Sequence, residues 1–217
     1  MALQYSPEAQ IAMHAASSLA GFYRKGTLTA ELLLLTLTQD DAVRAVWPEA
    51  ADLDAVLEAR ILADESPGDK DGWSAPAKRA LHAAWDRAGA RRRFVGPGDL
   101  LSGLAGAGGL AGELLSRSAV AYADVDAASS AHSAAASPPG SVVLYDDSTT
   151  PMDFVVATLR EVLGCTQPRA VHYMYRTHFV GKATVGPFAD APDRVRRALQ
   201  MAREAGFPLR VEMVATT

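Results

Sequence analysis

Two adjacent carboxylates and one histidine are the side chains of this chain best suited to bind a cation or to move a proton. Asp146 and Asp147 directly follow a short apolar segment, and His178 stands near the end of a mostly apolar one. Such groups could ligate a metal ion or act as general acid and base, so a hydrolase is one interpretation. The plainer interpretation is a helix-capping turn, which would use Ser148, Thr149 and Thr150.

The segments around these residues predict a small α+β domain over residues 141–217. Short β-branched runs indicate strands, and apolar residues at helical spacing indicate helices. The expected order is strand 141–145, helix 151–163 capped by Thr150, helix 168–179, strand 183–188, helix 191–205 and strand 209–214. This order predicts three helices on one face of a three-stranded antiparallel sheet.

An Ala/Ser/Pro-rich segment precedes this domain. Residues 126–140 read DAASSAHSAAASPPG, with one charged residue and no large apolar side chain. Such a segment has little to bury, and its Pro138-Pro139 pair opposes a helix, so we expect a linker. The predicted organisation is a domain over residues 1–125, a linker over 126–140 and a domain over 141–217.

Residues 1–125 predict an all-helical domain built from two copies of one small unit. In the first copy an Ala-rich helix over residues 7–22 is followed by a break at Gly26 and a Leu-rich helix capped by Thr29. The same order of helix, break and helix returns over residues 74–104. A further helix is expected between the copies, over residues 51–63.

Composition excludes several classes of protein. The chain has 21 basic and 25 acidic residues, so its formal charge of −4 offers no basic field for nucleic acid. We interpret Arg91-Arg92-Arg93 as a solvated cap, because cations complement a helix dipole at the carboxyl end. No apolar run approaches the ~20 residues that span a bilayer, and no export signal is visible. With the lone Cys165, these features predict a cytoplasmic protein without metal or cofactor.

Three stretches of the second domain carry a resemblance to a known family. They are VVLYDDSTTPMDFV at 142–155, HFVGKA at 178–183 and the Pro208-Leu209 pair. In this order they resemble the ClpS family, the adaptors that deliver proteins with destabilising N-terminal residues (N-degrons) to Clp protease. The resemblance implies a non-enzymatic adaptor whose partners are a Clp ATPase and N-degron-bearing substrates.

The resemblance also implies roles for individual residues. Asp146, Asp147 and His178 would form an amine site, because an ammonium group needs acceptors from more than one direction. The side chain next to that amine would enter a pocket, and docking to the ATPase would involve Asp190 and Arg196. The pocket residues would be Met152, Val155, Met174, Thr177 and Leu209.

The sequence departs from the family at three of these positions. Asp146 stands where the family has Asn, and Ser148 stands where it has a second Asp. Thr177 replaces an aliphatic residue and would make the pocket wall partly polar. A second carboxylate beside one ammonium would either strengthen binding or, by repulsion, raise one pKa and weaken the site.

The first domain resembles the Clp N-terminal double-repeat domain. Residues 28–37, LTAELLLLTL, match its Thr-x-Glu-His-Leu-Leu-Leu signature with Leu32 in place of His. The second copy is weaker, with Gly98 where an acidic residue is expected, and the chain contains no Walker motif. The resemblance implies a fusion of this domain with a ClpS-like adaptor, a ClpA- or ClpC-like partner and an intramolecular contact between the domains. The alternative is a Clp-associated regulatory or interaction protein without N-degron binding.

Overall fold

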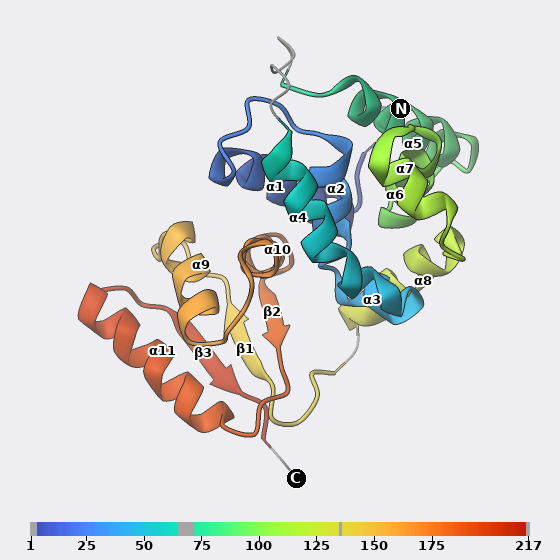
Figure 1. Ribbon diagram of the computed structural model, residues 1–217. Coiled ribbons are helices and arrows are strands. Elements are labelled where there is room, and N and C mark those ends of the chain that lie inside the picture. Colours follow the sequence, from blue (N-terminus) through green and yellow to red (C-terminus); the bar gives the residue numbers. More distant parts are fainter. Residues whose placement is uncertain (1–3, 65–71, 135, 216–217) are drawn as a thin grey trace. The chain divides into compact units, whose positions relative to one another are not determined.

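The computed structural model describes residues 4–64, 72–134 and 136–215 and contains two compact units, residues 1–134 and 135–217 (Figure 1). Unit 1 is helical throughout its described part. Its elements are α1 (Pro7–Phe22), α2 (Ala30–Leu37), α3 (Asp41–Val46), the 3₁₀ helix η1 (Pro48–Leu53), α4 (Asp54–Ala63), α5 (Ala75–Ala90), α6 (Pro97–Gly106), α7 (Gly109–Ser116) and α8 (Tyr122–Ala134).

The helices of unit 1 form two repeats. α1 begins at residue 7 and α5 at residue 75, and α4 begins at residue 54 and α8 at residue 122. Within each of these two pairs, the second helix therefore begins 68 residues after the first. The first helix of each repeat has the same cap, because Ser6 and Ser74 each accept a hydrogen bond from the backbone three residues later. The predicted double repeat is therefore present in the structure.

The central helix α2 carries the core of unit 1. All of its leucines are at most 1% exposed. Its first turn is capped by Thr29, whose hydroxyl oxygen accepts the Leu32 N–H at 3.3 Å. A helix this apolar on every side needs neighbours around it, and α1, α4, α5, α6 and α7 all pack against it.

The prediction of a linker beginning at residue 126 was wrong. Residues 122–134 form α8, which packs on α3 and α6 of unit 1. Alanine favours a helix when a surface is available, and here the 68-residue repeat supplies the position that α4 holds in the first copy. The helical unit thus ends at residue 134 rather than 125.

The arginine run also differs from the prediction. Arg93 is not a solvated cap: it donates two hydrogen bonds to Asp99, at 2.6 and 2.8 Å, and one to Asp126 at 2.9 Å. Asp99 is fully buried, so it needs cationic partners that the sequence pattern alone did not identify.

Unit 2 is a three-stranded antiparallel sheet with three helices. Its elements are β1 (Val142–Tyr145), α9 (Met152–Glu161), α10 (Gln167–Val180), β2 (Lys182–Val185), α11 (Ala191–Ala205) and β3 (Arg210–Met213). The strand order is β2-β1-β3, and Val142 pairs with Val185 on one side and Met213 on the other. This is the predicted α+β fold.

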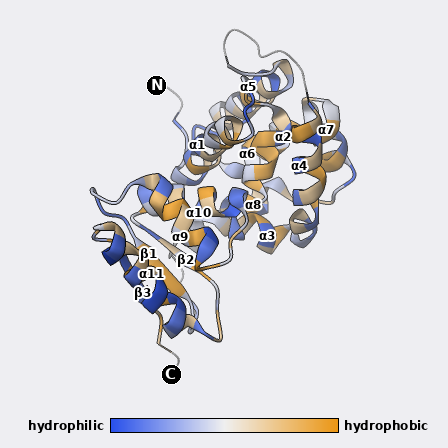
Figure 2. Cartoon of the chain, turned by 60° about the vertical axis from the view of Figure 1, so that its left-hand side comes forward, coloured by the Kyte–Doolittle hydropathy of each residue, from blue (hydrophilic) through white to orange (hydrophobic). Residues whose placement is uncertain are grey.

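One hydrophobic core joins the sheet of unit 2 to its helices. Leu144 and Val142 of β1 are fully buried in it, together with Leu159 of α9 and Ala198 of α11. α11 packs along β3 and β1, and α10 packs against β2. Figure 2 shows that α11 is largely hydrophilic, because only its narrow alanine-rich side meets the core. Among the described residues, no helix is long and apolar enough to cross a membrane.

Candidate functional site

The candidate site forms where β1 ends beside the carboxyl end of α10. The Asp146 N–H donates to the Gly181 carbonyl oxygen at 2.9 Å, which fixes the start of the acidic turn. Gly181 ends α10 with φ +86°, a left-handed conformation that glycine adopts without strain. His178 lies one turn earlier on α10 and is thereby held next to Asp146.

A cavity of about 180 Å³ opens at this place in unit 2. Its lining joins the acidic turn to side chains of α9 and α10. The lining residues are Tyr145, Asp146, Asp147, Ser148, Thr150, Met152, Val155, Met174, Thr177 and His178. The structure therefore brings together the three residues predicted for the amine site and four of those predicted for the side-chain pocket.

The polar end of the cavity holds His178 and Asp146. Nδ1 of His178 lies 3.6 Å from Oδ1 of Asp146, and both side chains are roughly half exposed, at 48% and 42%. This separation is too long for a direct hydrogen bond. Two acceptors this far apart can both lie ~2.8–3.0 Å from a third atom between them, so the pair can share one donor group.

Asp147 shapes the turn. Its Oδ1 accepts the backbone N–H groups of Thr149 at 2.9 Å and Thr150 at 2.6 Å. Partial burial alone would raise the pKa of Asp147, but these hydrogen bonds outweigh it and hold the pKa below the ordinary value. Both of these backbone bonds are accepted by Oδ1.

The turn is held by a capping side chain, but this side chain is Asp147 and not the predicted Thr150. Asp147 ties down the turn, whereas Thr150, expected as the cap of the next helix, lies one residue too early. α9 begins at Met152 with Pro151 at its N-cap and no side-chain cap hydrogen bond. Ser148 lines the cavity, whereas Thr149 does not. Thr149 contributes to the turn through its backbone N–H, which Asp147 accepts.

The apolar wall of the cavity comes from α9 and α10. Val155 and Met174 are 9% and 5% exposed, whereas Met152 at the rim is 41% exposed. The Thr177 hydroxyl donates to the Tyr173 carbonyl oxygen at 2.9 Å within α10. That hydrogen bond satisfies its donor, so Thr177 makes the wall less polar than its residue type suggests.

Leu209, predicted as a pocket residue, is not among the residues that line this cavity. It is 4% exposed and belongs to the hydrophobic core of unit 2, which also contains the lining residues Val155 and Met174. A role of Leu209 in the pocket therefore stays a prediction. Conversely, the lining includes Tyr145, whose position beside Asp146 in the sequence was the only signal for it.

The two residues predicted for docking to an ATPase lie at the start of α11, each with a local partner. Asp190 accepts a hydrogen bond from Arg194 at 2.7 Å, and this bond lowers the pKa of Asp190. Arg196 pairs with Asp193 at 2.9 Å. Asp190 and Arg196 are themselves largely exposed, at 53% and 71%, so both can contact another protein. Arg194 is only 24% exposed and also donates to the Val162 carbonyl oxygen at 2.8 Å.

The described part of the chain holds no group of three or more His, Cys, Asp or Glu side chains arranged to hold a metal ion. Asp146, Asp147 and His178 thus line one cavity without forming such a group.

The sequence of unit 2 matches known proteins. The model of the family described as ATP-dependent Clp protease adaptor protein ClpS matches residues 135–212. The ATP-dependent Clp protease adapter protein ClpS of Hydrogenovibrio crunogenus is 40% identical over 74 residues, which are 33% of this chain and 71% of that protein. The chain belongs to the ClpS family.

Other ClpS proteins give the same result. The adapter protein ClpS of Treponema denticola is 35% identical over 74 residues, 33% of this chain and 73% of its own length. That of Shewanella denitrificans is 39% identical over 70 residues, 31% of this chain and 69% of its own length. The ClpS-family match falls on unit 2, which contains the whole candidate site.

Proposed function

We propose that the chain is a non-enzymatic, cytoplasmic adaptor that captures N-degrons in the cavity of unit 2 and delivers their proteins to a Clp ATPase. The observation that carries this proposal is the 3.6 Å separation between His178 Nδ1 and Asp146 Oδ1 at the mouth of a cavity with an apolar wall. The α-ammonium of a substrate would lie between these two acceptors. The first side chain would enter between α9 and α10.

The chemistry of the site favours an amine over an internal peptide segment. A free α-ammonium has three donors and a positive charge, which the carboxylates of Asp146 and Asp147 and a ring nitrogen of His178 would meet from different directions. An acetylated or internal residue would bring no such donors and would leave the carboxylates partly desolvated and unpaired. Methionine side chains in the wall suit several large apolar side chains, because they are flexible and polarisable.

The carboxylate of Asp146 gives this site more negative charge than the family's asparagine would. Asp147 is already stabilised in its charged form by the turn, and Asp146 supplies the charge that faces His178. Two carboxylates favour a full positive charge between them. We therefore expect a stronger preference for an ionised amine than an Asn would give.

The partner proposed for unit 2 is an ATPase of the ClpA or ClpC type. Its relatives are named ATP-dependent Clp protease adapter proteins, which supports a Clp partner. Asp190 and Arg196 at the start of α11 are proposed contacts, since both are charged and largely exposed.

Unit 1 is proposed to be a Clp N-type double-repeat domain. The 68-residue repeat and the motif at the start of α2 support this assignment. A ClpS unit tethered to such a domain would meet it at high effective concentration, so unit 1 would regulate docking to the ATPase. Removing residues 1–134 should then raise the affinity of unit 2 for the ATPase, and an unchanged affinity would contradict this role.

Fluorescence anisotropy of labelled peptides tests amine capture. We expect full-length protein to bind peptides that begin with Leu, Phe, Tyr or Trp more tightly than one that begins with Met-Glu. Peptides with an acetylated terminus should not bind. If no free-amine peptide binds while the protein still binds a Clp ATPase, the chain acts instead as a regulatory or interaction protein of the Clp system.

A further inference from the structure

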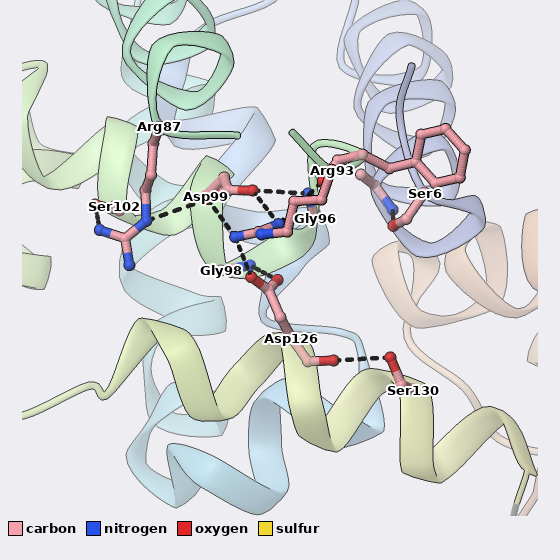
Figure 3. Close-up of polar contacts among 11 residues, drawn as sticks. Ser6, Arg87, Arg93, Gly96, Gly98, Asp99, Ser102, Asp126 and Ser130 are labelled. Atoms are coloured by element: carbon pink, nitrogen blue, oxygen red, sulfur yellow. Dashed lines mark hydrogen bonds and ion pairs between the residues drawn. The ribbon is translucent and has the colours of Figure 1, made fainter. Parts of the chain in front are cut away.

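The last helix of unit 1, α8, is held by a compact network of charges (Figure 3). Asp126 of α8 accepts the Gly98 N–H at 2.8 Å with Oδ1, and its Oδ2 accepts Arg93 Nη2 at 2.9 Å. Arg93 in turn binds the fully buried Asp99, which accepts the Gly96 N–H at 3.0 Å. One carboxylate of α8 therefore reaches both the first turn of α6 and the loop before it.

Close approach of α8 favours glycine at two positions, the N-cap of α6 (Gly96) and its first turn (Gly98). A Cβ at Gly98 would overlap the carbonyl oxygen of Tyr122, and a Cβ at Gly96 would overlap Oδ1 of Asp126. Neither glycine has a positive φ, so the requirement comes from the contact with α8 and not from the turn itself.

The equivalent helix of the first repeat shows what α8 lacks. α4 is anchored by Leu57 and Ile61, which are 0% and 2% exposed. At the 68-residue spacing their counterparts in α8 are Val125 and Ser129. Replacing isoleucine by serine removes most of the apolar area of one anchor, and the buried Ser129 hydroxyl has no hydrogen-bond partner.

The charge network carries a cost of its own. Burial raises the pKa of Asp126, while the Gly98 N–H and Arg93 act in the opposite direction and Asp99 adds repulsion. The ionised carboxylate is thus held at a desolvation cost. Few buried apolar contacts and one dominant polar anchor are typical of a segment that opens before the rest of its unit.

We propose that α8 is a detachable latch, anchored through Asp126 on Gly98 and Arg93, whose release lengthens the connection between the two units. With α8 in place, residues 135–141 connect α8 to β1; after its release, residues 122–141 do so. Random-coil scaling gives an average reach of ~15 Å for the short connection and ~25 Å for the long one. The latch thus sets the effective concentration at which each unit meets the other.

Hydrogen–deuterium exchange of the full chain tests the latch. In the wild type, amides of α8 should exchange through an opening that leaves α1, α2 and α5 protected. Asp126→Asn and Gly98→Ala should each lower the protection of α8 by roughly tenfold or more while the other helices keep theirs. Ser129→Ala should raise the protection of α8, because it removes the unsatisfied buried hydroxyl.

Two matched variants control for helix content and surface change. Gly106→Ala lies in the same helix as Gly98 but has open space at its Cβ position, and Asp124→Glu alters an exposed residue of α8 while keeping its charge. Neither should change α8 protection by more than about twofold. The latch is contradicted if α8 and α2 lose protection together in the wild type. It is equally contradicted if Asp126→Asn leaves α8 as protected as before.

Discussion

His178 Nδ1 and Asp146 Oδ1 lie 3.6 Å apart although 32 positions separate the two residues in the sequence, one on α10 and one in the turn after β1. The hydrogen bond from the Asp146 N–H to Gly181 brings them together. The pair leaves space between its two acceptors rather than closing into a hydrogen bond. The first prediction concerns the acceptor that His178 supplies.

Peptide binding should require a hydrogen-bond acceptor at position 178. His178→Leu removes the ring nitrogen that lies 3.6 Å from Asp146 Oδ1 and should lower the affinity for a Leu-initiated peptide at least ~10-fold at pH 7.5. His178→Gln keeps an acceptor and should retain more of the affinity than His178→Leu. Peptide anisotropy measures both variants, and equal affinities of His178→Leu and the wild type would contradict the acceptor role.

Asp147 should stabilise unit 2 in a pH-dependent way. Its folded-state pKa is lowered, because the N–H bonds of Thr150 and Thr149 outweigh the effect of partial burial. This stabilisation is fully present above the unfolded pKa of ~3.9 and is lost as the pH falls through the folded value. Asp147→Ala should cost about 1 kcal/mol at pH 7, by analogy with other capping side chains.

Exchange protection of the unit 2 amides measures that effect. The wild type and Asp147→Ala should converge once the pH falls below the lowered folded-state pKa of Asp147, since the carboxylate is then protonated in the wild type. Asp153→Ala serves as a control, because Asp153 is an exposed carboxylate in the same region. A constant difference between Asp147→Ala and the wild type from pH 7 to pH 2 would show that the charge of Asp147 is irrelevant.

Substitutions at Leu209 and Met152 should affect the stability of unit 2 and its peptide preference separately. Leu209→Ala removes a core side chain and should destabilise unit 2 by about 2–4 kcal/mol, with little change in the order of preferred peptides. Met152→Ala changes a side chain that is 41% exposed at the rim and should alter peptide preference at nearly unchanged stability. Thermal unfolding and peptide anisotropy on both variants check this pair, and a reversed pattern would place Leu209 in the pocket.

The buried Asp99 should be essential for unit 1. It pairs with Arg93 at 2.6 Å and lies 3.1 Å from Arg87 Nε, so Asp99→Ala leaves two arginines without their shared carboxylate. The loss should be about 3 kcal/mol, with unit 2 unaffected. All three tryptophans, at positions 47, 73 and 85, belong to unit 1, so tryptophan fluorescence in urea reports its unfolding. An unchanged midpoint would contradict the role of this network.

The local elements of unit 2 could be predicted because their signals are local. α11 spans Ala191–Ala205 as expected, since proline near its start and Gly206 at its end mark both limits. The acidic turn and the wall residues of the cavity also follow from short motifs and helical spacing. The place of the Leu209 side chain in the core does not, because a residue just before a strand gives no sign of which surface its side chain contacts.

Long-range contacts account for what the sequence did not show in unit 1. Arg93 looked like a solvated cation because nothing in the sequence pattern indicated that Asp99, six residues later, is buried or that Asp126, 33 residues later, reaches the same arginine. An Ala/Ser-rich segment has nothing large to bury, yet it forms α8 where the repeat provides a docking surface for it. Composition alone therefore could not distinguish a linker from a weakly anchored helix.

The central claim is that Asp146 and His178 share one substrate ammonium. It is tested most directly by measuring anisotropy affinities of a Leu-initiated peptide, free and N-acetylated, for wild type, Asp146→Ala, His178→Ala and the double variant at pH 7.5. Wild type should prefer the free amine by at least ~100-fold, and the two single substitutions should be coupled, so that the double variant loses less than the sum of both. Equal affinities of the wild type for free and acetylated peptides would contradict the claim.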